Sequence, residues 1–218
     1  MNVWHDIDPA RIKPEDFLAV IEIPKGSKKK YELDKQTGLI ILDRILYTST
    51  HYPANYGFIP RSYGDDGDPL DVLVLCSEVL DPLTLVRCYP IGYISMLDCG
   101  KNDEKIIAIP FSDPSYNKYR DIMDLPDHTF DEMAHFFTVY KALEGKANRP
   151  KTVVAGNLAA LDASGNLTDS GKKAEILLEM SIKSLTFPAE GWAATDGMEE
   201  LHQQAVTQKD IISLVKAD

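Results

Sequence analysis

The sequence has little cysteine, fewer basic than acidic residues and no long apolar run, and each of these shortages excludes some classes of protein. Its three cysteines form no C-x-x-C pair, and two of them stand in apolar stretches, which favours buried, reduced thiols. No apolar run reaches the roughly 20 residues that a membrane-spanning helix needs. The first residues carry neither the basic nor the apolar region of a signal peptide. We therefore expect a cytoplasmic protein with no membrane partner.

The charge balance is acidic. The chain has 34 Asp and Glu against 23 Lys and Arg, which gives a formal net charge of -11. A nucleic-acid-binding surface needs a basic footprint, so we expect no nucleic-acid partner. An acidic protein that binds an anion needs cations as intermediaries. The length of 218 residues, with 44% hydrophobic residues, suits one domain with a substantial core.

The most informative segment is the acidic stretch from Gly64 to Asp71, which places four carboxylates within seven residues, directly before the apolar run 72–75. Like charges this close raise one another's pKa and destabilise the fold unless a cation lies among them. Oxygen ligands suit hard divalent ions, with Mg²⁺ or Mn²⁺ as the usual choices. The segment therefore predicts a metal site at the end of a buried strand.

The first half of the chain alternates short apolar runs with turn residues. Several short strands at this spacing, without helices between them, favour a closed or partly closed antiparallel barrel. The predicted strands cover residues 17–23, 30–34, 39–42, 72–75, 83–88, 91–97 and 106–109. After residue 126 the apolar spacing becomes helical, which predicts helices over 127–145, 172–185 and 195–215, with a loop over 148–170.

Further charged residues fall where phosphate and metal ligands would be needed. Period-two geometry puts Lys30 and Glu32 on one face of their strand, although a solvated edge face would explain this strand if it stood alone. Asp98 and Asp103 flank a turn before Lys105 and form a second acidic cluster. Carboxylates hold Mg²⁺, whereas Lys and Arg hold phosphate oxygens directly.

Taken in order, these segments resemble the family I (soluble) inorganic pyrophosphatases of the bacterial type. The family signature Asp-x-Asp-Pro-hydrophobic-Asp stands here at residues 66–71. The resemblance covers roughly residues 17 to 146, and no single motif carries it. The other matching segments are Val20–Pro24, Lys30–Glu32, Asp43–Arg44, Tyr52–Gly57, Arg87–Gly92, Ala134–Phe137 and Tyr140–Lys141.

The resemblance implies hydrolysis of inorganic pyrophosphate to two orthophosphates by a multi-Mg²⁺ site with a metal-activated water. Mn²⁺ or other divalent ions are the expected substitutes. The implied fold is α+β and mainly β: a five-stranded antiparallel barrel of the oligonucleotide/oligosaccharide-binding (OB) type with flanking α-helices.

The resemblance also assigns roles to individual residues. Asp68 would be the general base. The metal ligands would be Asp66, Asp71 and Asp103, with Asp98 and Glu32 for ions that arrive with substrate. The phosphate ligands would be Lys30, Arg44, Tyr56, Lys105, Tyr140 and Lys141, and Glu22 and Tyr52 would support the site.

The C-terminal part departs from the family pattern. We expect residues 1–146 to form the barrel core with the first helix, and 147–218 to form an extension that packs on the same domain. The family's closing segment matches either Lys173–Ile176 or Glu190–Trp192, and both matches remain open. The resemblance implies a homo-oligomer, a hexamer in typical bacterial members; His135 of the implied interface helix is present, but Val139 stands where a second histidine often lies.

Three other functions are alternatives to pyrophosphate hydrolysis. An EF-hand calcium loop starting at Asp66 fails at its fifth and sixth positions, which are Leu70 and Asp71. A nucleic-acid-binding barrel would need a basic, aromatic-rich groove instead of an acidic one. A phosphatase for organic phosphoesters would use the same ligands and is the hardest alternative to exclude.

Overall fold

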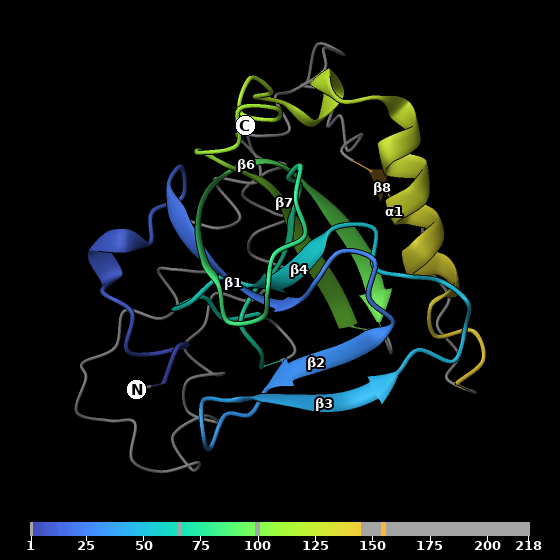
Figure 1. The fold of residues 1–218 in the computed structure, drawn as a ribbon, viewed down its shortest axis with the longest axis horizontal. Coiled ribbons are helices and arrows are strands. Elements are labelled where there is room, and N and C mark those ends of the chain that lie inside the picture. Colours follow the sequence, from blue (N-terminus) through green and yellow to red (C-terminus); the bar gives the residue numbers. More distant parts are fainter. Residues whose placement is uncertain (1, 65–66, 99–100, 145–153, 156–218) are drawn as a thin grey trace.

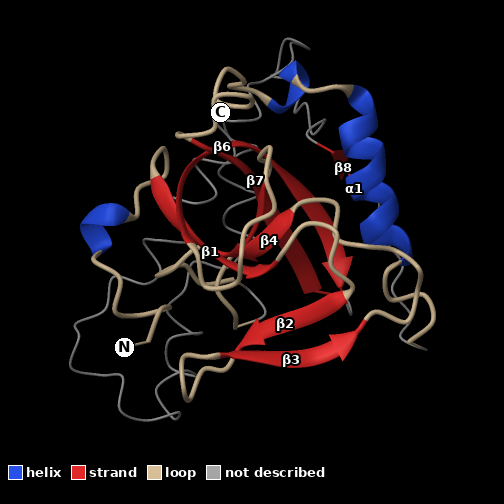
Figure 2. Ribbon diagram, in the orientation of Figure 1, coloured by secondary structure: helices blue, strands red, loops and turns tan. Residues whose placement is uncertain are grey.

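The computed structural model describes residues 2–64, 67–98, 101–144 and 154–155 (Figure 1). The strands in this part of the chain are β1 (Phe17–Ile23), β2 (Lys29–Leu33), β3 (Ile40–Ile45), β4 (Asn55–Phe58), β5 (Asp71–Val74), β6 (Leu85–Asp98), β7 (Lys101–Pro110) and β8 (Val154–Ala155). The helices are α1 (Asp127–Val139) and the short 3-10 helices η1 (Pro9–Arg11) and η2 (Ile122–Asp124) (Figure 2).

Five strands close into a barrel in the order β1-β4-β5-β7-β6, because β6 pairs back onto β1 with Phe17 opposite Cys88. Four of the five pairings are antiparallel, whereas β5 and β7 run parallel. The predicted five-stranded OB-type barrel of the α+β class is confirmed. The parallel pair is a feature that local sequence patterns do not reveal, since strand direction depends on the connections between strands.

Every residue of β1 and β4 is buried, because both faces of the barrel wall are covered there. Val72 and Ile106 belong to one apolar cluster. Their neighbours Leu73 and Ile107 belong to a second cluster, which also contains Phe136 of α1. Helix α1 therefore packs against the face of the wall that carries the odd-numbered residues of β5 and β7.

Two strand predictions need correction. The runs 83–88 and 91–97 form one continuous strand, β6, whose register shifts between Pro90 and Gly92 and so accommodates a proline in mid-strand. Strand β4 is absent from the predicted strands, since Asn55–Phe58 contain a glycine and follow a proline-containing stretch. It is a strand because it fills the gap between β1 and β5, and all four of its residues are buried.

The predicted helix over 127–145 begins at Asp127 in the structure as well, but ends earlier, at Val139. Pro126 is the N-cap, and Asp127 lies in the first turn, where its carboxylate complements the helix dipole. Beyond Val139 the chain continues in tighter turns, with the Glu144 N–H donating to the Lys141 carbonyl. The predicted helices over 172–185 and 195–215 lie outside the described residues.

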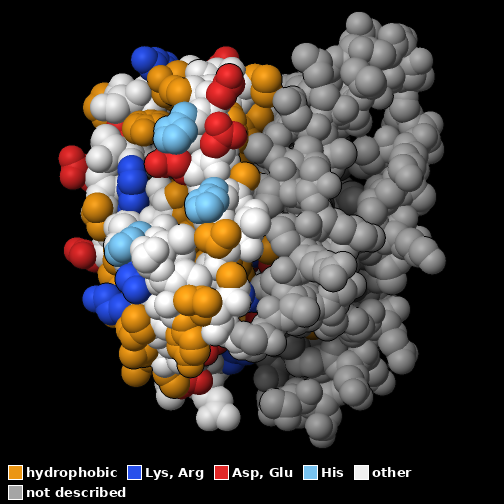
Figure 3. All heavy atoms as spheres, turned by 90° about the vertical axis from the view of Figure 1, so that its right-hand side faces the viewer, with side chains coloured by type: hydrophobic (Ala, Val, Ile, Leu, Met, Phe, Trp, Pro, Cys, Tyr) orange, Lys and Arg blue, Asp and Glu red, His pale blue; other side chains and the backbone are white. Residues whose placement is uncertain are grey.

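Strands β2 and β3 form a separate two-stranded sheet beside the barrel (Figure 1). The hairpin exposes several large apolar side chains, namely Leu39, Ile41, Leu42, Ile45 and Tyr47. Figure 3 shows hydrophobic side chains gathered low on the molecule, at the height of this hairpin, with histidines on the same face.

Cys76 and Cys88 are free and buried, as the apolar context of the thiols predicts. Across the described ranges, no helix combines the length and apolar composition needed to cross a membrane.

Gly57 of β4 lies tightly against the backbone of β1. A Cβ atom there would stand 1.8 Å from the Val20 carbonyl oxygen, a backbone atom that has no room to move. We expect Gly57→Ala to lower the free energy of unfolding by about 3 kcal/mol or more, since overpacking at a rigid site is costly. Urea denaturation measures the loss.

Gly26→Ala is the matched control. Gly26 has a positive φ of 80° but open space around its Cβ position, so its substitution should cost only about 1 kcal/mol. Equal losses for the two variants would contradict the importance of the β1–β4 contact.

Candidate active site

The centre of the candidate site is the buried ammonium of Lys105, which three side chains from neighbouring strands surround. Its Nζ donates to Asp71 Oδ2 at 2.6 Å, to Asp103 Oδ1 at 2.7 Å and to the Tyr56 hydroxyl at 3.1 Å. Lys105 is 2% exposed. The Tyr56 hydroxyl in turn donates to Asp71. The structure therefore brings together four residues that the sequence analysis assigned to metal or phosphate.

Strand pairing explains this convergence. In the parallel pair β5–β7, Asp71 lies directly opposite Lys105. Asp103 precedes Lys105 by two residues on β7 and so points to the same face. Tyr56 reaches the same place from β4, whose residues pair with β5.

The charge of Lys105 is held in place by its neighbours. Burial is the largest influence on the Lys105 pKa and lowers it, but the carboxylates of Asp103 and Asp71 outweigh burial and hold the pKa well above its usual value. Two acidic side chains within hydrogen-bond distance of one nitrogen must lie within a few ångströms of each other. The ammonium between them offsets the repulsion between the two carboxylates.

Aromatic rings line the site on the side of α1. The Nζ of Lys105 lies 5.5 Å from the centroid of the Phe137 ring. Tyr52 and Tyr140 are buried in the same apolar cluster, and burial raises the pKa of both hydroxyls. The Lys141 ammonium lies 5.2 Å from the ring centroid of Tyr140. These residues place neutral hydroxyl donors and a second cation beside the carboxylates.

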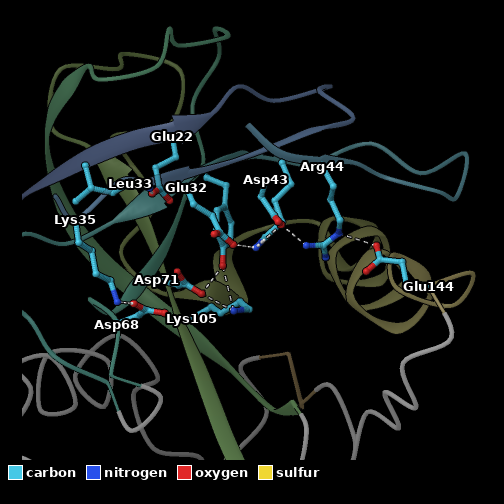
Figure 4. A network of polar contacts seen from close by, with 12 residues as sticks. Glu22, Glu32, Leu33, Lys35, Asp43, Arg44, Asp68, Asp71, Lys105 and Glu144 are labelled. Carbon is cyan, nitrogen blue, oxygen red and sulfur yellow. Dashed lines mark hydrogen bonds and ion pairs between the residues drawn. The ribbon is translucent and has the colours of Figure 1, made fainter. Parts of the chain in front are cut away.

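A second charged group lies on the β2–β3 hairpin. Lys30 forms ion pairs with Glu32 on its own strand and, at 3.3 Å, with Asp43 on β3. Arg44 pairs with the same Asp43 and donates through Nε to Glu144 at 2.9 Å. Figure 4 shows this row of side chains beside Asp71 and Lys105. The predicted sharing of one strand face by Lys30 and Glu32 is confirmed.

Glu22 supports the hairpin from β1. Its Oε1 accepts a hydrogen bond from the Leu33 N–H at 2.8 Å. Burial raises the Glu22 pKa from 4.5 to about 8, and the nearby charge of Asp71 adds to the effect. Glu22 therefore retains a proton at neutral pH when the site holds no other cation.

Asp68 comes from the loop between β4 and β5. Its side chain is about half exposed and forms an ion pair with Lys35, from the turn between β2 and β3 (Figure 4). An exposed carboxylate is accessible to water, as a general base must be.

Two predicted ligands are not placed at the side-chain level. Asp66 lies outside the described residues, and for Asp98 the structure describes only its backbone at the end of β6. Within the described ranges, no three His, Cys, Asp or Glu side chains converge as a metal site. The carboxylates that are placed, Asp71 and Asp103, are oxygen donors close to each other, which suits a hard divalent ion.

Three residues of the site were not assigned a role from sequence. Asp43 bridges Lys30 and Arg44, Glu144 holds the Arg44 guanidinium, and Lys35 pairs with Asp68. Asp43 is adjacent to Arg44, so its position was a usable signal. Glu144 stands 100 residues from Arg44, and nothing local in the sequence indicates that they meet.

A family model and similar known proteins both identify this chain with one family. A model of the inorganic pyrophosphatase family matches residues 19–164. The chain is 48% identical over 167 residues to soluble inorganic pyrophosphatase 2 of Chlamydomonas reinhardtii, which covers 77% of this chain and 85% of that protein.

Solved structures of inorganic pyrophosphatases also resemble this chain. The inorganic pyrophosphatase from Helicobacter pylori aligns with a TM-score of 0.70 and 37% identity, over 81% of this chain and 96% of that chain. The enzyme from Thermus thermophilus aligns with a TM-score of 0.71 and 33% identity, over 86% and 100%. The fold and the comparisons define a hydrolase on an OB-type barrel. The chain belongs to the family I soluble inorganic pyrophosphatases and is an inorganic diphosphatase.

The raised pKa of Glu22 predicts how stability depends on pH. The folded state keeps the Glu22 proton up to about pH 8, whereas the unfolded state releases it near pH 4.5. The folded state therefore binds more protons between these values, and stability falls as pH rises, by on the order of 4 kcal/mol in full. Glu22→Gln should remove this fall, since its side-chain oxygen still accepts from Leu33.

Chemical denaturation of the metal-free protein in EDTA, at pH 5, 6.5 and 8, measures the difference between Glu22→Gln and wild type. Exposed Glu15→Gln serves as the control and should keep the wild-type slope. A Glu22→Gln variant with the wild-type slope would show that Glu22 ionises normally in the folded protein.

Proposed function

We propose that this diphosphatase works through several divalent ions, with Mg²⁺ as the physiological one, and that the cluster around Lys105 is where pyrophosphate is cleaved. The observation that carries the proposal is the buried Lys105 ammonium shared by Asp71 and Asp103. Bound Mg²⁺ would supply positive charge for the substrate and lower the pKa of an attacking water. The metal ligands would be Asp71, Asp103 and Glu32, together with Asp66 and Asp98.

Arg44 supports a phosphate-binding role for the hairpin. Its Nη2 is buried and has no acceptor within the described part of the chain, while the rest of its guanidinium is held by Asp43 and Glu144. A buried donor without an acceptor is costly, and a phosphate oxygen would satisfy it. The other proposed phosphate ligands are Lys30, Tyr56, Lys105, Tyr140 and Lys141.

Lys105 would act in two ways. In the structure its ammonium balances the charge of Asp71 and Asp103. Its third N–H, which donates to the Tyr56 hydroxyl in the structure, would donate to a phosphate oxygen when substrate binds, since an ammonium is a strong donor to phosphate. Tyr52 and Glu22 would support this group from the apolar cluster and from β1.

Asp68 would take the proton of the attacking water. Its carboxylate is accessible, and it precedes Pro69, which fixes one backbone dihedral next to it. A positioned carboxylate beside an acidified water needs to accept only a weakly held proton. The charge that develops on the leaving phosphate would be met by the cations of the site.

The remaining features of the proposal concern the whole protein. We propose a cytoplasmic homo-oligomer with residues 1–146 as the catalytic core; the exposed apolar side chains of the β2–β3 hairpin support self-association. The bacterial type stays a prediction, since the similar proteins come both from a green alga and from bacteria.

The direct test is orthophosphate release from pyrophosphate, nucleotides and sugar phosphates, with Mg²⁺, with Mn²⁺ and with EDTA. We expect rapid release from pyrophosphate with Mg²⁺, little release from the phosphoesters, and loss of release in EDTA. Preferential release from sugar phosphates would favour the phosphoesterase alternative. Release from pyrophosphate that EDTA does not reduce would contradict the metal mechanism.

Asp68→Asn tests the proposed base. Turnover should fall by about 100-fold or more, the range in which general-base catalysis contributes. Mg²⁺ binding, measured by equilibrium dialysis, should be retained because the ligands Asp71 and Asp103 are unchanged. Wild-type turnover in Asp68→Asn would remove this residue as the base.

Asp71→Asn tests the metal site, with Asp34→Asn as its matched control. The Mg²⁺ concentration for half-maximal activity should rise in Asp71→Asn by at least the roughly 10-fold that loss of even an outer-shell partner costs. Asp34 is partly exposed and accepts from Thr37 and Gln36 within its own turn, so its variant should keep the wild-type Mg²⁺ dependence. Equal shifts in the two variants would mean that Asp71 is not a ligand.

A further inference from the structure

Lys35 connects the proposed base to the N-terminal segment. Its ammonium forms an ion pair with Asp68 Oδ1 and lies 5.5 Å from the centroid of the Trp4 ring. Lys35 comes from the turn between β2 and β3, and Asp68 from the loop between β4 and β5 (Figure 4). The lysine thus lies between an aromatic face and a carboxylate, both of which attract a cation.

Trp4 is fixed independently of Lys35. It is 1% exposed, and its indole Nε1–H donates to the Ser62 carbonyl at 3.0 Å. The Trp4 carbonyl accepts from the Arg61 N–H at 2.9 Å. The hydroxyl of Ser62 accepts from the Leu70 N–H at 2.8 Å, on the other side of the acidic segment. Trp4 is therefore anchored to the base of the loop that carries Asp68.

The hairpin turn is tied to the same N-terminal segment. The Asn2 side chain donates to the Lys35 carbonyl at 3.4 Å. The Asp68 carbonyl accepts from the Gly64 N–H at 2.7 Å, which closes the acidic loop. The backbone on both sides of the ion pair is thus held, so that the positions of Lys35 and Asp68 are set relative to each other.

Stability alone gives little reason for this arrangement. The side chains of Lys35 and Asp68 are 51% and 53% exposed, and exposed ion pairs contribute little to the stability of a fold. A general base, however, must hold its carboxylate within hydrogen-bond reach of one water, where small displacements cost much of the rate.

We propose that Lys35, held over the ring of Trp4, is a positioning residue that orients the carboxylate of Asp68 for catalysis. This inference rests on the proposed function, in which Asp68 is the general base. Lys35 need not touch pyrophosphate, so its removal should affect the catalytic step more than substrate binding.

The test compares Lys35→Met, Lys35→Arg and a matched control, Lys29→Met. Lys29 is an exposed lysine of the same hairpin and lies 5.9 Å from the centroid of a ring, that of Tyr31. For Lys35→Met we expect kcat to fall on the order of tenfold, because a misplaced catalytic group loses rate. KM should change by less than about twofold, since a positioning role acts on the transition state. Lys35→Arg should recover most of kcat, and Lys29→Met should keep the wild-type values.

A second readout needs neither metal nor activity. The chain has two tryptophans, Trp4 and Trp192, so a Trp192→Phe background leaves Trp4 as the only emitter. In the metal-free protein, Lys35→Met should shift the emission maximum of Trp4 by removing the charge over its ring, and Lys29→Met should not. Melting temperatures of the two variants should agree.

A wild-type kcat in Lys35→Met would overturn the proposal, as would a loss that Lys35→Arg does not recover. A loss of kcat that accompanies a lower melting temperature than that of Lys29→Met would show a structural role instead. A wild-type enzyme that releases no orthophosphate in the same assay would overturn the proposed function, which keeps the two failures distinguishable.

Discussion

The site depends on one buried cation held between two carboxylates. Because β5 and β7 run parallel, Asp71 and Lys105 lie opposite each other, and Asp103 follows from the period-two geometry of β7. A buried ammonium is costly unless it is paired, and two adjacent carboxylates are costly unless a cation separates them. The ammonium of Lys105 and the two carboxylates therefore offset the cost of burying one another. The surrounding aromatic cluster excludes water and strengthens every charge interaction within it.

The same logic extends outward to the hairpin and the acidic loop. Lys30 and Arg44 both form ion pairs with the carboxylate of Asp43, and Arg44 forms a second ion pair with Glu144. Lys30, Arg44 and Lys105 are thus each held by at least two acidic side chains. This explains how an acidic protein can offer Lys and Arg donors to a highly charged anion. Without the anion, the neighbouring carboxylates balance the charge of these donors.

Much of the barrel can be predicted from the sequence, because its strands contain short apolar runs. The acidic segment indicates a metal site, because few other structures place so many carboxylates together. What local patterns cannot supply is the pairing of distant elements. The parallel pairing of Asp71 with Lys105, the strand at Asn55–Phe58 and the contact of Glu144 with Arg44 arise only from tertiary packing. The metal, phosphate and base roles of the site residues all remain proposals, and the side chains of Asp66 and Asp98 lie outside the described part of the protein.

We propose that the carboxylates which share Lys105 also hold divalent metal. A crystal structure with Mn²⁺ bound, with anomalous scattering recorded on both sides of the manganese absorption edge, would locate the ion. We expect a manganese peak within about 2.0–2.6 Å of carboxylate oxygens of both Asp71 and Asp103. Manganese bound elsewhere, with the Lys105 ammonium still bridging the two carboxylates, would contradict it.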